Sequence, residues 1–248
     1  MIKAVIFDLD GTLIDTNDLI LDTFQHVIKE CLGRVPTVDE LHQVYGKTLD
    51  EQMGFFSMER SQELVASYKV YYRSHMDERT HLFEGVKSLL DKLFTKGIQM
   101  AAVTNKGSRG VQHAFDKFDL GKYFVAAITA DDVVKGKPDP EGILTALQQL
   151  GVTAEEALFV GDSHSDILAA KGAGVKSVLV GWTFFHEDHY ATFEADFVIE
   201  KPMDLMGLIA MSEEQFNAEI EKGLNDLANG KVVSAERVAK LMKRDYGV

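Results

Sequence analysis

Two aspartates, Asp8 and Asp10, stand one residue apart in the segment DLDGT, directly after the apolar run AVIF. A carboxylate can attack phosphorus as a covalent nucleophile, and a second carboxyl group beside it can protonate the leaving oxygen and then activate water. An Asp-x-Asp pattern alone is weak evidence, because aspartate often ends a strand or opens a turn. The pair indicates phosphoryl chemistry only if other polar residues converge on it.

Three further segments carry polar residues at or near the ends of apolar runs. Thr104 and Asn105 end the run IQMAAVTN, and Asp162 ends the run ALFVGD. Asp166 follows Asp162 by one helical turn. Lys137 lies in the segment KGKPDP, whose two prolines stiffen the loop. A lysine and several carboxylates are therefore available to join the aspartate pair.

Short apolar runs alternate along the chain with segments of helical apolar spacing, such as residues 85–97 and 140–151. Strands that are apolar throughout, separated by helices, are typical of a buried parallel sheet. The pattern predicts an α/β fold with a Rossmann-like parallel sheet core. The expected strands are residues 3–7, 98–105, 124–129, 157–162, 177–182 and 196–200.

One region interrupts this alternation. Residues 15–82 have helical spacing and no convincing strand, which predicts a helical cap inserted after the first strand, over the carboxyl edge of the sheet. The core is then residues 1–14 and 83–210. The polar residues 211–248 predict a helical C-terminal tail. The tail is either a decoration packed on the core or a segment that binds a protein partner or a second copy of the chain.

The carboxyl ends of all strands in an open parallel sheet meet at one edge, so these polar side chains should converge. Several carboxylates beside one lysine would repel one another, and a hard divalent cation is the natural counter-charge. Mg²⁺ takes oxygen ligands and commonly bridges carboxylates to a substrate phosphate. The sequence therefore predicts a magnesium site at this edge.

The segments DLDGT, VTN, KGKPDP and GDSHSD, in this order, resemble the four motifs of the haloacid dehalogenase-like phosphatases. The resemblance covers residues 1 to about 210. It implies that Asp8 is the nucleophile, that Asp10 is the general acid and base, and that Thr104 and Asn105 hold the phosphoryl oxygens. The dehalogenase branch of the family lacks the second aspartate, so dehalogenation is disfavoured.

The same resemblance implies that Lys137 steadies the nucleophile and the phosphate. It implies a Mg²⁺ site formed by Asp8, the backbone carbonyl of Asp10, and Asp162, with Asp166 in support. Within the family the chain looks most like the phosphoglycolate phosphatase branch, and it is similar to the inorganic pyrophosphatases of that branch.

Each motif residue also has a plainer interpretation. Thr104 and Asn105 could cap the following helix, a position compatible with phosphate binding. Lys137 taken alone would be a solvated loop lysine. Asp166 could be a structural anchor instead of a metal ligand.

The substrate side of the site offers three candidate cations. Lys47 lies in YGKTL, which either faces the phosphate or simply connects two helices, and Lys106 and Arg109 lie in TNKGSRG. These cations favour pyrophosphate, whose leaving group is a second charged phosphoryl group. The alternatives are phosphoglycolate or another small phosphomonoester, a phosphosugar mutase, and a regulator that binds phosphate without turnover.

Composition narrows the choice of partners. The net charge of -13 opposes binding to nucleic acid, and no Lys/Arg-rich run is present. No apolar run approaches the length of a membrane span or resembles a signal peptide, so we expect a cytoplasmic protein with no membrane partner. A small phosphorylated substrate remains compatible with the charge, because a metal ion and local cations can reverse the field in a pocket.

Overall fold

A parallel sheet forms the centre of the molecule. The computed structural model describes residues 1–182 and 191–210, and the predicted tail, residues 211–248, lies outside them. Within the described residues, six strands pair in the order β5-β4-β1-β6-β7-β8, each pair parallel. The strands are β1 (Ala4–Phe7), β4 (Gln99–Val103), β5 (Ala126–Ile128), β6 (Ala157–Gly161), β7 (Lys176–Val180) and β8 (Phe197–Ile199).

This strand order is that of the doubly wound fold. Counted in chain order among themselves, the strands run 3-2-1-4-5-6, so the order reverses between β1 and β6. Ligands of such sheets bind at the carboxyl ends of the strands beside this switch point. The predicted fold class, a Rossmann-like parallel sheet with a helical insertion, is confirmed.

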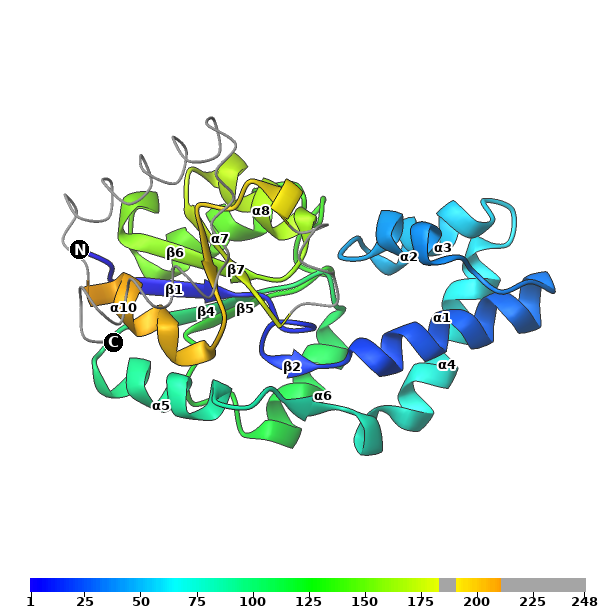
Figure 1. The fold of residues 1–248 in the computed structure, drawn as a ribbon, viewed down its shortest axis with the longest axis horizontal. Helices are drawn as coiled ribbons and strands as arrows, with labels where there is room; N and C mark the ends of the chain where they lie inside the picture. Colours follow the sequence, from blue (N-terminus) through cyan, green and yellow to red (C-terminus); the bar gives the residue numbers. More distant parts are fainter. Residues whose placement is uncertain (183–190, 211–248) are drawn as a thin grey trace.

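Helices cover both faces of the sheet, because side chains alternate between the faces along each strand. Val5 and Phe7 pack with α5 (Val86–Thr95), α6 (Ser108–Phe118) and α10 (Leu205–Ala210). Ala4 and Ile6 pack with α7 (Glu141–Leu150) and α8 (His164–Ala173) on the opposite face (Figure 1). The described part of the core also contains the 3₁₀ helices η1 (Ala154–Glu156), η2 (Ala191–Phe193) and η3 (Pro202–Asp204).

The helical insertion has a hydrophobic core of its own. Its helices, which we call the cap, are α1 (Asn17–Leu32), α2 (Val38–Val44), α3 (Leu49–Phe56) and α4 (Ser61–Arg79). Buried residues of all four pack together, among them Phe24, Met53 and Leu64. Thr37 and Thr48 begin α2 and α3 with capping boxes, which satisfy the first N–H groups of each helix. Figure 1 shows the cap beside the carboxyl edge of the sheet.

Two short strands that the sequence did not predict join the cap to the core. β2 (Ile14–Asp15) pairs antiparallel with β3 (His81–Leu82), so the chain enters and leaves the cap side by side. Lys117 of α6 braces this junction, since its Nζ donates to the carbonyl oxygens of Asp77 and Thr80 at 2.8 Å. Two-residue strands lack the apolar alternation by which strands are recognised.

The structure also changes the expected start of α6. Gly107 is the N-cap and the helix begins at Ser108, so Thr104 and Asn105 are not its capping residues. They lie instead between the end of β4 and the helix. Across the described ranges, no helix is both long and apolar enough to cross a membrane.

The separate core of the cap predicts a large effect of a single buried substitution. Leu64 is fully buried, so Leu64→Ala should lower the free energy of unfolding by about 2–5 kcal/mol, through lost transfer free energy and a cavity. Val70 lies on the same helix with 70% of its surface exposed, so Val70→Ala is the matched control. Urea denaturation followed by circular dichroism measures both, and equal losses would contradict the assignment of this core.

Candidate active site

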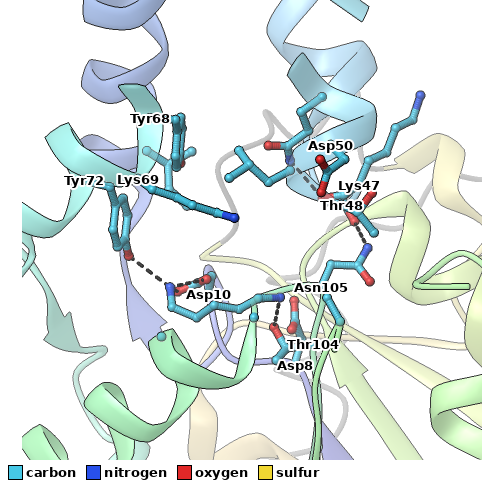
Figure 2. A pocket seen from close by; sticks show the side chains of 18 of the residues that line it. Asp8, Asp10, Lys47, Thr48, Asp50, Tyr68, Lys69, Tyr72, Thr104 and Asn105 are labelled. Carbon is cyan, nitrogen blue, oxygen red and sulfur yellow. Dashed lines mark hydrogen bonds and ion pairs between the residues drawn. The ribbon is translucent and has the colours of Figure 1, made fainter. Parts of the chain in front are cut away.

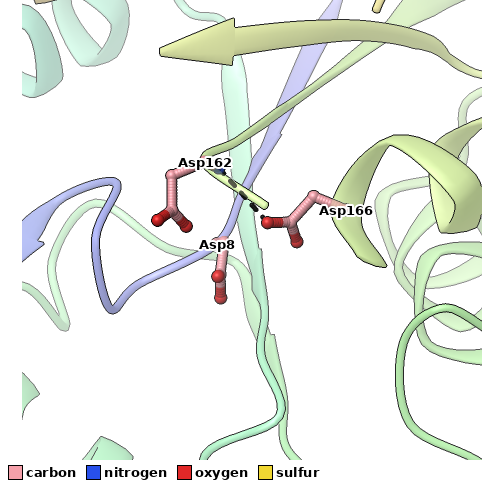
Figure 3. A group of neighbouring side chains, drawn as sticks. All are labelled: Asp8, Asp162 and Asp166. Atoms are coloured by element: carbon pink, nitrogen blue, oxygen red, sulfur yellow. Dashed lines mark hydrogen bonds between the residues drawn. The ribbon is translucent and has the colours of Figure 1, made fainter. Parts of the chain in front are cut away.

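Asp8 and Asp162 lie next to each other because they follow the two strands at the switch point. Phe7 of β1 pairs with Val160 of β6, and the Asp8 N–H donates to the Val160 carbonyl at 2.9 Å. Asp166, on the first turn of α8, lies beside them (Figure 3). All three side chains are buried, and each offers a carboxylate oxygen within 4.8 Å of the others. The structure therefore brings together the predicted acidic group.

Lys137 supplies positive charge to this group. Its Nζ lies 2.6 Å from Asp166 Oδ1 and 2.9 Å from Asp8 Oδ1, and the side chain is 3% exposed. Despite this ion pair, Asp8 Oδ1 accepts no hydrogen bond of regular geometry from any described residue. One lysine thus faces three buried carboxylates, and negative charge remains uncompensated.

The pKa values reflect this imbalance. Burial raises the pKa of Asp8 to about 6, Lys137 acts in the opposite direction, and the charge of Asp166 adds to the rise. Burial also raises the pKa of Asp162 well above its ordinary value, with further contributions from Asp166 and Asp8. Burial lowers the pKa of Lys137, but the two carboxylates it contacts outweigh this and raise it. The lysine is therefore charged in the folded protein.

Asp166 anchors the loop that carries Asp162. Its Oδ2 accepts hydrogen bonds from the Asp162 N–H at 3.2 Å and from the Ser163 N–H and hydroxyl at 3.0 and 2.7 Å. Its Oδ1 is paired with Lys137. With both oxygens engaged, the geometry favours the anchoring role that the sequence left open, and a direct metal-ligand role stays a prediction.

Gly11 makes room for Asp162. It adopts a φ of +80°, and a Cβ at this position would lie 2.3 Å from Asp162 Oδ2. A side chain there would displace the carboxylate, so the glycine of DLDGT is needed for close approach as well as for the turn. The adjacent Thr12 hydroxyl lies 3.5 Å from Asp162 Oδ1, a contact that sequence reasoning did not identify.

Asp10 is held by Lys106. The Lys106 Nζ donates to both Asp10 carboxylate oxygens, at 2.7 and 2.9 Å, and to the Tyr72 hydroxyl of α4 at 3.1 Å (Figure 2). Burial lowers the pKa of Lys106, but Asp10 and Tyr72 outweigh it and raise the pKa. The predicted substrate cation Lys106 therefore already has a carboxylate partner, and it links Asp10 to the cap.

Asn105 links the Lys137 loop to the cap. Its Nδ2 donates to the carbonyls of Lys137 and Gly46, both at 2.8 Å, and its Oδ1 accepts from the Lys137 N–H at 2.8 Å. Gly46, with a φ of +79°, packs so closely on the core that a Cβ would lie 2.5 Å from Ser163 Oγ. The segment YGKTL is thus docked on the core, and the Asn105 amide is committed to positioning.

A cavity of about 490 Å³ separates the cap from these residues. Thr104 lies on its wall, buried, with its hydroxyl accepting from the Lys106 N–H at 3.3 Å. Asp166 lies behind the wall, fully buried. The predicted residues that line the cavity are Asp8, Asp10, Lys47, Thr104, Asn105, Lys106, Arg109, Lys137 and Asp162.

The cavity is also lined by ionisable residues that the sequence analysis did not single out, among them Lys69, Arg73, His113 and Asp131. Helical spacing places Lys69 and Arg73 one turn apart on α4, and that signal was available in the sequence. The spacing alone does not show whether this face of the helix is directed toward a cavity or toward solvent.

The arrangement is that of a hydrolase with a capped doubly wound core, and comparison with known proteins agrees. The family model described as haloacid dehalogenase-like hydrolase matches residues 5–180. The chain belongs to the haloacid dehalogenase-like hydrolase family. The predicted resemblance, and the prediction of a phosphatase within this family, are confirmed.

Individual relatives are similar over most of their length. A provisionally named pyrophosphatase PpaX of Clostridium perfringens is 39% identical over 209 residues, covering 84% of this chain and 98% of the relative. The pyrophosphatase PpaX of Anoxybacillus flavithermus is 36% identical, covering 85% and 98%. The crystal structure of a provisionally named phosphoglycolate phosphatase from Lactobacillus plantarum superposes with a TM-score of 0.74 at 26% identity, covering 83% of this chain and 99% of that one.

The position of Lys137 should depend on the Asn105 amide. Asn105→Ala removes two hydrogen bonds to the Lys137 backbone, so we expect kcat for p-nitrophenyl phosphate to fall about tenfold to hundredfold, as the lysine moves relative to Asp8. The matched control is Gln112→Ala, which removes an exposed amide that bonds Asp116 on the surface of α6. Steady-state kinetics at saturating substrate test this, and an unchanged kcat in Asn105→Ala would show that the link is dispensable.

Proposed function

We propose that this protein is a Mg²⁺-dependent phosphohydrolase that cleaves inorganic pyrophosphate through an aspartyl-phosphate intermediate. The observation that carries the proposal is the buried group of Asp8, Asp162 and Asp166 beside Lys137, of which Asp8, Asp162 and Lys137 line a cavity that the cap covers. The choice of pyrophosphate rests on the relatives named as pyrophosphatases.

The residues present fit a Mg²⁺ ion. The donor set consists of carboxylate oxygens, which this hard cation prefers, and three buried carboxylates share the charge of one lysine. Asp8 and Asp162 would hold the ion with the backbone carbonyl of Asp10, and Asp166 would support Asp162. When bound, the ion neutralises these carboxylates and polarises the phosphoryl group.

In the proposed reaction the side chains act in successive steps. An Asp8 carboxylate oxygen attacks one phosphorus, and the bridging P–O bond breaks with its electron pair leaving on the second phosphate. Thr104 would hold the attacked phosphoryl group and Lys137 would stabilise its charge. Asn105, whose amide bonds Lys137 and Gly46, would position Lys137. Asp10, positioned by Lys106, takes a proton from the water that hydrolyses the aspartyl phosphate, and this step restores Asp8.

The competing function is hydrolysis of a small phosphomonoester such as phosphoglycolate, as the name of the Lactobacillus plantarum structure suggests for that protein. Comparing kcat/KM for pyrophosphate and phosphoglycolate at equal Mg²⁺ separates the two. A clear preference for pyrophosphate supports the proposal, whereas a preference for phosphoglycolate leaves only the general phosphatase function. A requirement for a sugar bisphosphate would indicate a mutase, and no phosphate release from any donor would indicate a regulator.

Replacing Asp8 and replacing Asp10 should impair catalysis in different ways. Asp8→Asn removes the nucleophile, so turnover and covalent labelling by phosphate after an acid quench should both disappear. Asp10→Asn leaves the nucleophile in place and should lower kcat about 10²–10⁴-fold, the usual share of general acid–base catalysis. Asp116→Asn, on the exposed surface of α6, is the control. Substantial turnover by Asp8→Asn would rule out the covalent mechanism.

Stabilisation by Mg²⁺ should depend on pH. Without metal, Asp8 has a pKa of about 6 in the folded protein, above the value of roughly 3.9 for an unfolded aspartate. Between these values the folded protein retains a proton that the unfolded chain has lost, so this group's contribution to stability falls as pH rises through about 4 to 6. Mg²⁺ competes with that proton.

Differential scanning fluorimetry should therefore find a larger increase in Tm on adding Mg²⁺ at about pH 7.5 than at about pH 5. Asp8→Asn removes the titrating group and should reduce the difference between the two conditions. An equal increase at both pH values in the wild type would contradict the assignment of Asp8 to the metal site.

A further inference from the structure

Helix α4 of the cap directs a cationic face toward the active-site cavity. Lys69, Tyr72, Arg73 and Met76, spaced at i, i+3, i+4 and i+7, all line the cavity. In Figure 2 the Lys69 amino group extends from the helix into the space above Asp10 and Asp8. The cavity therefore has a basic wall on the cap, across from the carboxylates on the core.

Lys69 and Arg73 differ from two nearby arginines, Arg60 and Arg79, because those arginines are paired with carboxylates. Arg60 is paired with Glu63 at 2.6 Å, and Arg79 is paired with Asp22 at 2.5 Å. Lys69 and Arg73 form no hydrogen bond or ion pair with any residue in the described ranges 1–182 and 191–210. Their charges are therefore available to a ligand.

The charge of Lys69 affects the pKa of a residue on the core side of the cavity. The pKa of Asp131, in the loop after β5, is lowered chiefly by hydrogen bonds from Ser108 and in addition by the charge of Lys69. Asp131 also lines the cavity. Lys69 thus lies close enough to the core for its charge to act across the cavity.

Of the other cations that line the cavity, Arg109 lies on α6 of the core, and three more are paired or directed elsewhere. Lys137 is paired with Asp8 and Asp166, and Lys106 is paired with Asp10. Lys47 lines the cavity, but Figure 2 shows its amino group directed away from Asp8 and Asp10. The free charge facing the reacting centre from the cap is therefore that of α4.

We propose that Lys69 and Arg73 form a second anion site on the cap, which binds the leaving phosphoryl group of a phosphoanhydride whose other phosphoryl group lies at Asp8. The inference rests on the proposed function and adds to it the residues that select the substrate. An arginine can bind two phosphoryl oxygens at once, and a lysine adds a mobile point charge. A leaving phosphoryl group carries more charge than a single carboxylate, so two cations favour the anhydride over phosphoglycolate.

The test measures binding separately from turnover. Calorimetry with Mg²⁺ and imidodiphosphate, a pyrophosphate analogue with a nitrogen bridge, gives the affinity of the wild type and of Lys69→Met and Arg73→Met. We expect each substitution to weaken binding about tenfold to hundredfold, the usual loss for a hydrogen bond to a charged group. Lys29→Met, which removes an exposed charge from α1 of the same cap, is the matched control and should bind as the wild type does.

Kinetics give a second readout. Lys69→Met and Arg73→Met should raise KM for pyrophosphate by a similar factor and leave KM for p-nitrophenyl phosphate, which has no second phosphoryl group, nearly unchanged. Lys69→Arg keeps the charge and should restore most of the affinity, whereas Arg73→Lys keeps the charge but loses the two-oxygen contact and should restore only part of it. Equal effects on both substrates, or unchanged affinity for imidodiphosphate, would overturn the inference, since α4 would then present only a solvated surface.

The outcomes separate this inference from the function on which it rests. If imidodiphosphate binding depends on Lys69 and Arg73 while the wild type turns over phosphoglycolate better than pyrophosphate, the anion site stands and the pyrophosphatase proposal fails. If the wild type prefers pyrophosphate but the variants bind imidodiphosphate normally, the function stands and the site is wrong. Failure of the wild type to bind imidodiphosphate overturns both.

Discussion

The ion pairs of Lys137 hold this active site together. A lysine that is 3% exposed and contacts two carboxylates, one of them fully buried, is stable only while every partner stays in place. Breaking a buried pair leaves an uncompensated charge, at a cost of about 3–5 kcal/mol. Asn105 fixes the backbone of Lys137, and Asp166 fixes the loop of Asp162. Three strand ends that are distant in sequence are thereby bound into one unit with residual negative charge.

That residual charge explains why the site suits a cation and a phosphate together. Ionising all of these buried carboxylates around one lysine is energetically unfavourable, as the raised pKa values of Asp8 and Asp162 indicate. Oxygen ligands with excess negative charge favour a hard divalent ion. Positive charges that would balance a substrate lie farther out, on the cavity wall, so the site has an acidic floor and a basic face on α4 of the cap.

The cap completes this division through a few direct contacts with the core. Gly46 docks against Ser163 and accepts a hydrogen bond from Asn105, while Tyr72 contacts the Lys106 that holds Asp10. Lys117 braces the end of α4 beside the two-stranded junction. Any movement of the cap about this junction therefore also shifts the partners of Asp10 and of the Lys137 loop, which couples access to the cavity with the geometry of the catalytic groups.

The sequence by itself determined the sheet, its helices and the residues at the strand ends, because apolar runs and helical spacing are local signals and the carboxyl ends of parallel strands must share an edge. Asp8, Asp162 and Lys137 were predicted to converge for that reason, and Asp166 was expected near Asp162, one helical turn further on. The structure places all four together.

Tertiary structure alone decided which partner each side chain takes. Lys106, a predicted substrate cation that lines the cavity, is paired with Asp10, and the Asn105 amide is hydrogen-bonded to Lys137 and Gly46. The pairing of β2 with β3 and the orientation of Lys69 toward the cavity depend on contacts between segments far apart in the chain. Periodicity defines the faces of a helix such as α4, but only the packing of the cap on the core determines which face meets the cavity.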